Sequence, residues 1–178
     1  MGVYKTMFKI LGSLFVFVGS LYWGISTANK FKYRRDELLE LERCVNELKN
    51  EITYTYTSIP DILMNISLKS KKPISILFKK ISDMLYENQV NSIYEAFQKV
   101  FSQEKENLSL QQQDIDIILD LSKNLGQWDT KGHENMIDLT LFNLKKQSNR
   151  AEEIMIKNMK MYKYLGFSIG AVLVIIFI

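Results

Sequence analysis

The sequence is poor in the residues that usually carry catalytic or metal chemistry. Its one cysteine, Cys44, excludes a disulfide within the chain and a cluster of thiolate ligands, and we interpret it as an unreactive helical thiol. Its one histidine, His133, would have to serve alone in any His-based triad, so a surface position on a capped helix is favoured. The GxxxxGK[ST], GxGxxG, HExxH and GxSxG patterns are all absent. The sequence therefore predicts a protein that is not an enzyme and has no cofactor or metal.

A group of aspartates offers the alternative to that prediction. Asp116 and Asp120 would share one face of a helix, whereas Asp114 and Asp116 would not. Brought together they could bind a divalent ion and support metal-dependent hydrolysis. We favour the interpretation that they are acids near a helix N-terminus, where the helix dipole stabilises negative charge.

Proline and strand patterns are scarce as well. Pro60 and Pro73 are the only prolines, and the only alternating stretch is ITYTYTSI at 52–59. That stretch continues an apolar row of helical spacing, so we interpret it as the end of a helix. The row consists of Leu41, Val45, Leu48 and Ile52. We predict an all-α fold whose middle is a bundle of five to six helices.

Start and stop signals divide that bundle. Ser58 before Pro60 predicts one helix start, and Ser92 with Glu95 forms a capping-box pattern for another. Ser109 with Gln112 predicts the start of a fifth helix, after a polar loop at 103–109. The predicted helices run from the N-terminal end to about 57, then over 59–70, from 73 to 85, from 92 to 101, from 109 to 125, and from 129 onward. We expect the first and last helices to pack antiparallel.

Both ends of the chain are uncharged. Residues 10–29 contain no charged side chain, which is close to the roughly 20 apolar residues that a membrane-spanning helix needs. The last 15 residues, 164–178, span only about 22 Å as a helix, but Lys160 and Lys163 can extend their ammonium groups to the interface. We predict transmembrane helices at 1–29 and 163–178 that flank a domain at 30–162. The alternatives are a cleaved signal peptide at the start, and a buried or interfacial helix at the end.

Basic residues beside these segments predict their orientation. Seven lie on the inner flanks: Lys30, Lys32, Arg34, Arg35, Lys157, Lys160 and Lys163. Only Lys5 and Lys9 lie on the other side, so the positive-inside rule places the domain in the cytoplasm. Residues 36–163 carry 17 basic and 20 acidic residues, a net charge of −3, which favours anionic lipid partners at the flanks and argues against nucleic acid. A basic run could be a docking patch, a lipid-facing surface or simply a solvated face: Lys69, Lys71, Lys72, Lys79 and Lys80.

Four stretches together resemble one known family. They are KILGSLFVFVGS at 9–20, EITYTYTSIPDIL at 51–63, LGQWD at 125–129 and MYKYLGFSIGAVLVIIFI at 161–178. These motifs and their order along the chain are similar to those of the stage III sporulation protein AB family of endospore-forming bacteria. The resemblance covers essentially the whole chain. Gly126 and Asp129 match the Leu-Gly-x-x-Asp helix junction of that family, and His133 stands where the family often has glutamine.

The resemblance implies a role as well as a fold. It implies a non-enzymatic platform in the mother-cell membrane facing the forespore, within the channel complex that links the two cells. Its helical domain would be similar to the F-type platform proteins of type II secretion and type IV pilus systems. Partners would be a secretion-type ATPase, membrane lipids and other membrane proteins of the channel, with Gly126, Asp129 and His133 as a possible partner surface. The alternative is a membrane-tethered helical sensor or ligand-binding protein whose domain lies outside the cytoplasm.

Overall fold

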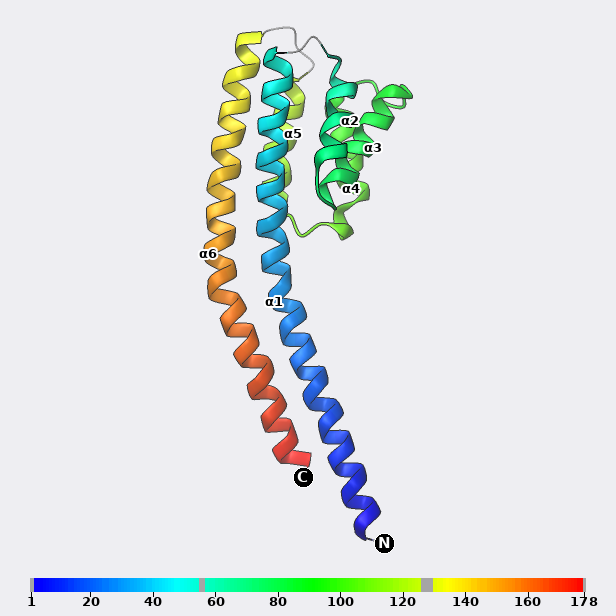
Figure 1. The fold of residues 1–178 in the computed structure, drawn as a ribbon, viewed down its shortest axis with the longest axis vertical. Coiled ribbons are helices and arrows are strands. Elements are labelled where there is room, and N and C mark those ends of the chain that lie inside the picture. The colour runs from blue at the N-terminus through cyan, green and yellow to red at the C-terminus, as the bar shows by residue number, and fades with distance from the viewer. Residues whose placement is uncertain (1, 55–56, 126–129, 178) are drawn as a thin grey trace. The chain divides into compact units, whose positions relative to one another are not determined.

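A computed structural model describes residues 2–54, 57–125 and 130–177 (Figure 1). All regular structure in these ranges is helical, which confirms the all-α prediction for the described part of the chain. The helices are α1 (Gly2–Tyr54), α2 (Ile59–Lys69), α3 (Ile74–Tyr86), α4 (Ile93–Gln103), the 3-10 helix η1 (Lys105–Asn107), α5 (Gln112–Asn124) and α6 (Thr130–Phe177).

The chain divides into two compact units. Residues 1–33 and 151–178 form one, which we call the terminal unit, and Arg34–Arg150 form the other, which we call the bundle. Helices α1 and α6 contribute residues to both units.

In the terminal unit, α1 and α6 approach closely at two glycines. A Cβ atom added to Gly24 would lie 2.9 Å from the carbonyl oxygen of Tyr162 and 3.1 Å from the Cα of Gly166. The Ser20 hydroxyl donates a hydrogen bond of 2.7 Å to the Gly166 carbonyl. The Phe31 ring stacks on the Tyr162 ring, with centroids 5.7 Å apart. Ser20, Gly24 and Gly166 thus form a contact in which the two backbones themselves meet.

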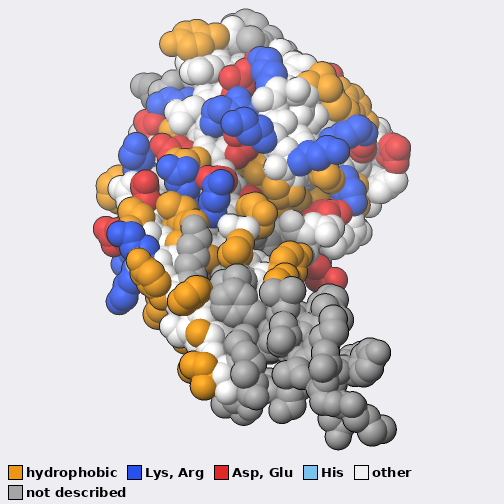
Figure 2. All heavy atoms as spheres, turned by 60° about the horizontal axis from the view of Figure 1, so that its bottom comes forward, with side chains coloured by type: hydrophobic (Ala, Val, Ile, Leu, Met, Phe, Trp, Pro, Cys, Tyr) orange, Lys and Arg blue, Asp and Glu red, His pale blue; other side chains and the backbone are white. Residues whose placement is uncertain are grey.

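The terminal unit also exposes many large apolar side chains. Figure 2 shows hydrophobic side chains over its described part. They include Val18, Tyr22, Trp23, Ile25, Leu165, Phe167, Ile169, Val172 and Ile175. No helix within the described residues has the combined length and hydropathy that a membrane span requires, so the predicted spans at 1–29 and 163–178 are not confirmed.

In the bundle, α1 and α6 run antiparallel, as expected. Lys49 Nζ lies 2.6 Å from Asp138 Oδ1, and farther along Lys145 Nζ lies 3.8 Å from Glu42 Oε1. Buried residues at helical spacing on both helices form one side of the core. On α1 these are Leu38, Leu41, Val45 and Leu48, and on α6 they are Ile137, Leu144 and Ser148.

The short helices supply the rest of the core. Helices α2 and α3 form an antiparallel pair, in which the Ser82 hydroxyl donates to the Pro60 carbonyl at 2.7 Å. The Phe97 ring packs edge-on against Phe78, with centroids 6.3 Å apart, and tilts against Phe101 at 6.5 Å. These aromatic contacts join α3 to α4 around side chains that are almost fully buried.

Two of the predicted helix starts are confirmed. The hydroxyl of Ser58 accepts a hydrogen bond from the Asp61 amide and caps α2. The hydroxyl of Ser92 accepts from the Glu95 amide at 3.1 Å and caps α4. The predicted capping box at Ser92 and Glu95 forms only in part. The Glu95 carboxylate accepts from the Asn91 amide, whereas in a full capping box it would accept from the Ser92 amide.

The predicted start at Ser109 is wrong. Helix α5 begins at Gln112 with Gln111 as its N-cap, and the Asp114 carboxylate accepts from the Gln111 amide at 2.9 Å. The Ser109 amide instead donates to the Glu37 carboxylate on α1 at 2.8 Å, so a tertiary contact holds Ser109 outside the helix. The predicted helix junction at Gly126 and Asp129 lies outside the described residues.

A row of polar residues on α1 places the connections of the bundle. The Arg34 guanidinium forms a two-pronged ion pair with Asp114, from Nε to Oδ2 at 2.8 Å and from Nη2 to Oδ1 at 3.0 Å. Arg34 is 7% exposed and Asp114 is fully buried. One turn later Glu37 holds Ser109. The start of α5 is therefore fixed on α1 by charge-assisted contacts.

The row continues to the connection between α2 and α3. The Glu40 carboxylate accepts from the Lys71 amide at 2.9 Å and from Arg43 Nη2 at 2.7 Å, and Arg43 Nη2 also donates to the Lys69 carbonyl at 3.0 Å. Burial raises the pKa of Glu40, but the bonds from Arg43 and Lys71 outweigh it and hold the pKa below its usual value. Glu40 therefore stays ionised where the connection needs an acceptor.

Replacing Gly24 tests the close approach in the terminal unit. Alanine normally stabilises a helix relative to glycine by about 0.5–1 kcal/mol. We expect Gly24→Ala to destabilise the contact between α1 and α6 instead. Its Cβ would meet backbone atoms, and overpacking of this kind costs about 1–3 kcal/mol. Hydrogen exchange of the amides at 20–28 should accelerate about tenfold.

Gly19→Ala is the matched control for that measurement. A Cβ at Gly19 would meet no atom within 4 Å, so exchange at 20–28 should stay the same or slow slightly. Equal exchange in the two variants would show that α1 and α6 do not meet at Gly24.

Removing the Asp114 carboxylate tests the polar row. Asp114→Ala leaves the Arg34 guanidinium buried without its partner, which should lower the free energy of unfolding in urea by about 3–5 kcal/mol. Asp120→Ala removes an exposed carboxylate that pairs with Lys123, so its loss should be about 0.2–1 kcal/mol. A loss for Asp114→Ala as small as that for Asp120→Ala would contradict the anchoring role of the pair.

Candidate partner-binding surface

The aspartates of α5 each have a separate structural partner. Asp114 pairs with Arg34, the Asp116 carboxylate accepts from Gln112 Nε2 at 2.9 Å, and Asp120 pairs with Lys123 Nζ at 2.8 Å. Among the described residues, no three His, Cys, Asp or Glu side chains are arranged to hold a metal ion. The geometry therefore gives no support to a metal site at Asp116 and Asp120.

The thiol of Cys44 is sealed inside the bundle. Its Sγ lies 3.1 Å from Ser70 Oγ, and the side chain is fully buried. Burial raises the pKa of the thiol to about 11, even though the Ser70 hydroxyl and the Arg43 charge act in the opposite direction. A thiol that stays protonated and buried agrees with the unreactive role predicted for it.

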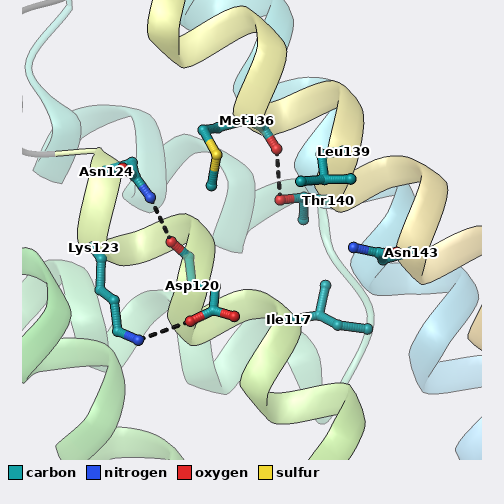
Figure 3. Close-up of a pocket in the computed structure, with 8 residues that line it drawn as sticks. All are labelled: Ile117, Asp120, Lys123, Asn124, Met136, Leu139, Thr140 and Asn143. Atoms are coloured by element: carbon teal, nitrogen blue, oxygen red, sulfur yellow. Dashed lines mark hydrogen bonds and ion pairs between the residues drawn. The ribbon is translucent and has the colours of Figure 1, made fainter.

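A groove lies between α5 and α6 in the bundle (Figure 3). It has a volume of about 230 Å³. Helix α5 contributes Ile117, Asp120, Lys123 and Asn124, and helix α6 contributes Met136, Leu139, Thr140 and Asn143. The groove exists because α6 directs Ile137 and Leu144 into the core, which leaves the next face of the helix beside α5.

Several polar groups of the groove are bonded locally. The Thr140 hydroxyl donates to the Met136 carbonyl at 2.8 Å, one turn back on α6. On α5, Asn124 Nδ2 donates to the Asp120 carbonyl at 2.9 Å, while the Asp120 carboxylate pairs with Lys123. These bonds leave the apolar groups of the groove available for a partner to cover.

An apolar pair on α6 borders this groove. Leu139 lines the groove and is 52% exposed, and Phe142 is 66% exposed three residues later, on the neighbouring part of the helix surface. Exposed aromatic and aliphatic side chains beside a groove are typical of protein-interaction sites. We call Leu139 and Phe142 the α6 ridge.

Sequence reasoning missed this surface. The apolar residues at helical spacing on this helix, which include Ile137, Leu141 and Leu144, predict the face that packs against other helices, and that row contains neither Leu139 nor Phe142. The available signal was that Leu139 and Phe142 are large and apolar but lie off that row.

The residues singled out from the sequence differ in environment where the structure describes them. Lys30, Lys32 and Lys160 are exposed, whereas Arg34 is buried against Asp114. Arg35 is half-buried beside Asp36 at 3.0 Å. Gly126 and Asp129 lie outside the described residues, as do the side chains of His133 and Lys163. Their proposed roles stay predictions.

Comparison with known proteins identifies the family. The family model for stage III sporulation protein AB matches residues 9–178. The chain belongs to the stage III sporulation protein AB family. This confirms the resemblance noted in the sequence and makes the chain a sporulation-related protein.

Two members of the stage III sporulation protein AB family show how far the similarity extends. The chain is 28% identical over 170 residues to "Stage III sporulation protein AB" of Bacillus subtilis (strain 168), covering 96% of this chain and 99% of that protein. A solved structure of "Stage III sporulation protein AB (SpoIIIAB)" superimposes with a TM-score of 0.64 at 24% identity, over 69% of this chain and 96% of that one. The structural match supports the helical fold alone.

Proposed function

We propose that the chain is a non-enzymatic membrane scaffold of the sporulation channel between mother cell and forespore. Its two ends are membrane helices in the mother-cell membrane, and its bundle lies in the cytoplasm. There the α6 ridge docks the secretion-type ATPase of the same complex, and the spans join the other membrane proteins of the channel. The observation that carries the proposal is an exposed apolar ridge beside a groove, on the helix that also carries the apolar C-terminal end.

The surface of the terminal unit supports membrane insertion. Large apolar side chains such as Trp23, Phe167 and Ile175 are exposed there, and lipid would cover them. Tyr22 and Trp23 lie near the end of the uncharged segment 10–29, where amphipathic rings favour the membrane interface.

The glycine contact supports pairing of the two ends within a bilayer. Lipid offers no hydrophobic force between helices, so membrane helices associate through small residues that allow close backbone contact. Ser20, Gly24 and Ala28 are spaced by four on α1, and Gly24 meets Gly166 of α6. The Ser20 hydroxyl has its acceptor inside this contact, as a polar group within hydrocarbon requires.

The docking role draws on the family resemblance and on the ridge. Platform proteins of secretion systems present a helical domain to a hexameric ATPase, and that fold-level analogy sets the expectation here. Phe142 and Leu139 supply the kind of apolar anchors from which a few residues provide most of the binding energy.

Topology is the first test of this function. A single cysteine at the exposed Gln103, in a Cys44→Ser background, should resist a membrane-impermeant thiol reagent in intact cells and react after lysis. Seven basic residues against two at the flanks of the spans lead us to expect that result. Labelling in intact cells would invert the protein and favour a tethered sensor whose domain lies outside the cytoplasm.

Substitution of the ridge tests ATPase docking. Leu139→Ala with Phe142→Ala should weaken binding of the purified ATPase to the reconstituted full chain by at least about tenfold. Leu68→Ala is the matched control, because Leu68 is 78% exposed on α2, away from the ridge, and its loss should leave binding unchanged. Equal affinity of the ridge variant and the unaltered chain would exclude the ridge as the docking site.

A further inference from the structure

We propose that one end of the bundle binds anionic phospholipid headgroups through Lys71, Lys72 and Lys105. This end, which we call the loop end, consists of the connections at 70–73 and 104–111. The inference rests on the proposed membrane anchoring and names the lipid chemistry that the bundle itself recognises.

The two connections lie at the same end of the bundle (Figure 1). Helices α2 to α5 alternate in direction, so the α2–α3 and α4–α5 connections share one end. Both are tied to neighbouring turns of α1, since Glu40 accepts from the Lys71 amide at 2.9 Å and Glu37 accepts from the Ser109 amide at 2.8 Å. The connections that contain Lys71, Lys72 and Lys105 are therefore fixed to α1 near Arg34, the first residue of the bundle.

Two acidic residues at or beside the loop end, Glu40 on α1 and Glu104, are engaged in ion pairs. Glu40 pairs with Arg43 at 2.7 Å. Glu104 pairs with Lys80 at 2.5 Å and also accepts from Asn107 Nδ2 at 2.8 Å. These bonds from Lys80 and Asn107 hold the pKa of Glu104 below its usual value, so its charge stays committed to them.

The three lysines, by contrast, form no ion pair with any described residue, although the charge of Lys71 acts on Glu40. Other lysines of the basic run are paired, Lys69 with Glu47 at 2.5 Å and Lys79 with Asp83 at 2.7 Å. Within the part of the chain that the structure describes, Lys71, Lys72 and Lys105 are exposed and form no ion pair. The one exposed acid in the two connections is Glu106. The loop end thus carries a positive excess although residues 36–163 are net acidic.

Chain connectivity limits how far the start of the bundle can lie from the first proposed span. Arg34 follows Asn29, the last residue of the first uncharged segment, by five residues, which extend at most about 18 Å in any conformation. A lysine close to an anionic leaflet contributes about 1 kcal/mol, and an unpaired lysine gives up no internal partner when it binds there. The acidic overall charge of the bundle disfavours nucleic acid as the alternative polyanion.

The test places a fluorophore on a cysteine at Gln103, beside the loop end, in the full chain with Cys44→Ser. The chain is reconstituted in vesicles of phosphatidylcholine alone or with added phosphatidylglycerol, and lipids with a nitroxide on the headgroup quench the fluorophore. We expect quenching to rise about twofold with phosphatidylglycerol and to lose that rise at about 1 M salt, where the Debye length falls to about 3 Å. The same label at Gln89, beyond the opposite end of α3, should show no rise.

Two matched double variants distinguish an effect of the loop-end lysines from an effect of the total charge of the bundle. Lys72→Gln with Lys105→Gln should abolish the rise, because about 2 kcal/mol of attraction is a roughly 30-fold change in the docked fraction. Lys99→Gln with Lys123→Gln removes the same charge from exposed, ion-paired lysines and should preserve it. Equal loss in both variants, or no rise with phosphatidylglycerol, would overturn the inference.

Carbonate extraction distinguishes this failure from failure of the proposed function. A chain that alkaline carbonate removes from phosphatidylcholine vesicles lacks the proposed spans, and that outcome overturns both proposals. A chain that resists extraction but shows no lipid-dependent quenching keeps its anchoring and overturns the loop-end inference alone.

Discussion

The bundle depends on a row of polar residues along α1, of which the buried pair between Arg34 and Asp114 is the deepest. A guanidinium taken out of water is stable only beside its counter-charge, so α5 has one acceptable position on α1. Glu37 and Glu40 likewise fix two connections on α1. Glu37 accepts from the Ser109 amide between α4 and α5, and Glu40 accepts from the Lys71 amide between α2 and α3. The apolar core supplies the driving force for packing, while this row selects one arrangement of the short helices.

The same row relates the two surfaces of the bundle. Because α5 is held at its first turn by Arg34, its later residues Ile117 and Asp120 lie beside α6 and complete the groove along the α6 ridge. Glu37 and Glu40 meanwhile hold the backbone of the loop end and leave its lysine side chains exposed. One surface is apolar and suited to a protein partner, and the other is cationic and suited to headgroups. The membrane scaffold that we propose, docked to an ATPase, would use both surfaces.

Local sequence signals predicted the helices well and the tertiary contacts poorly. Ser58 and Ser92 cap helices as predicted, because a capping hydroxyl acts on amides within three residues. The predicted helix start at Ser109 is wrong because the Ser109 amide donates to Glu37, which is distant in the sequence. Arg34 resembled a membrane-flanking cation from its neighbours alone, and only its distant partner Asp114 shows its structural role. The ridge at Leu139 and Phe142 was missed because periodicity identifies the face that is buried and says little about apolar residues elsewhere.

The separation of Arg34 from Asp114 also has a consequence for synthesis. The two residues are 80 positions apart, so at about 5–20 residues per second the guanidinium leaves the ribosome roughly 4–16 s before its carboxylate. In the membrane scaffold proposed above, the N-terminal segment would be available to the insertion machinery throughout that interval, while the nascent bundle cannot close. The proposed membrane insertion of the N-terminal segment would thus precede bundle assembly, and a translation product that stops short of α5 lacks Asp114 and cannot form the native bundle.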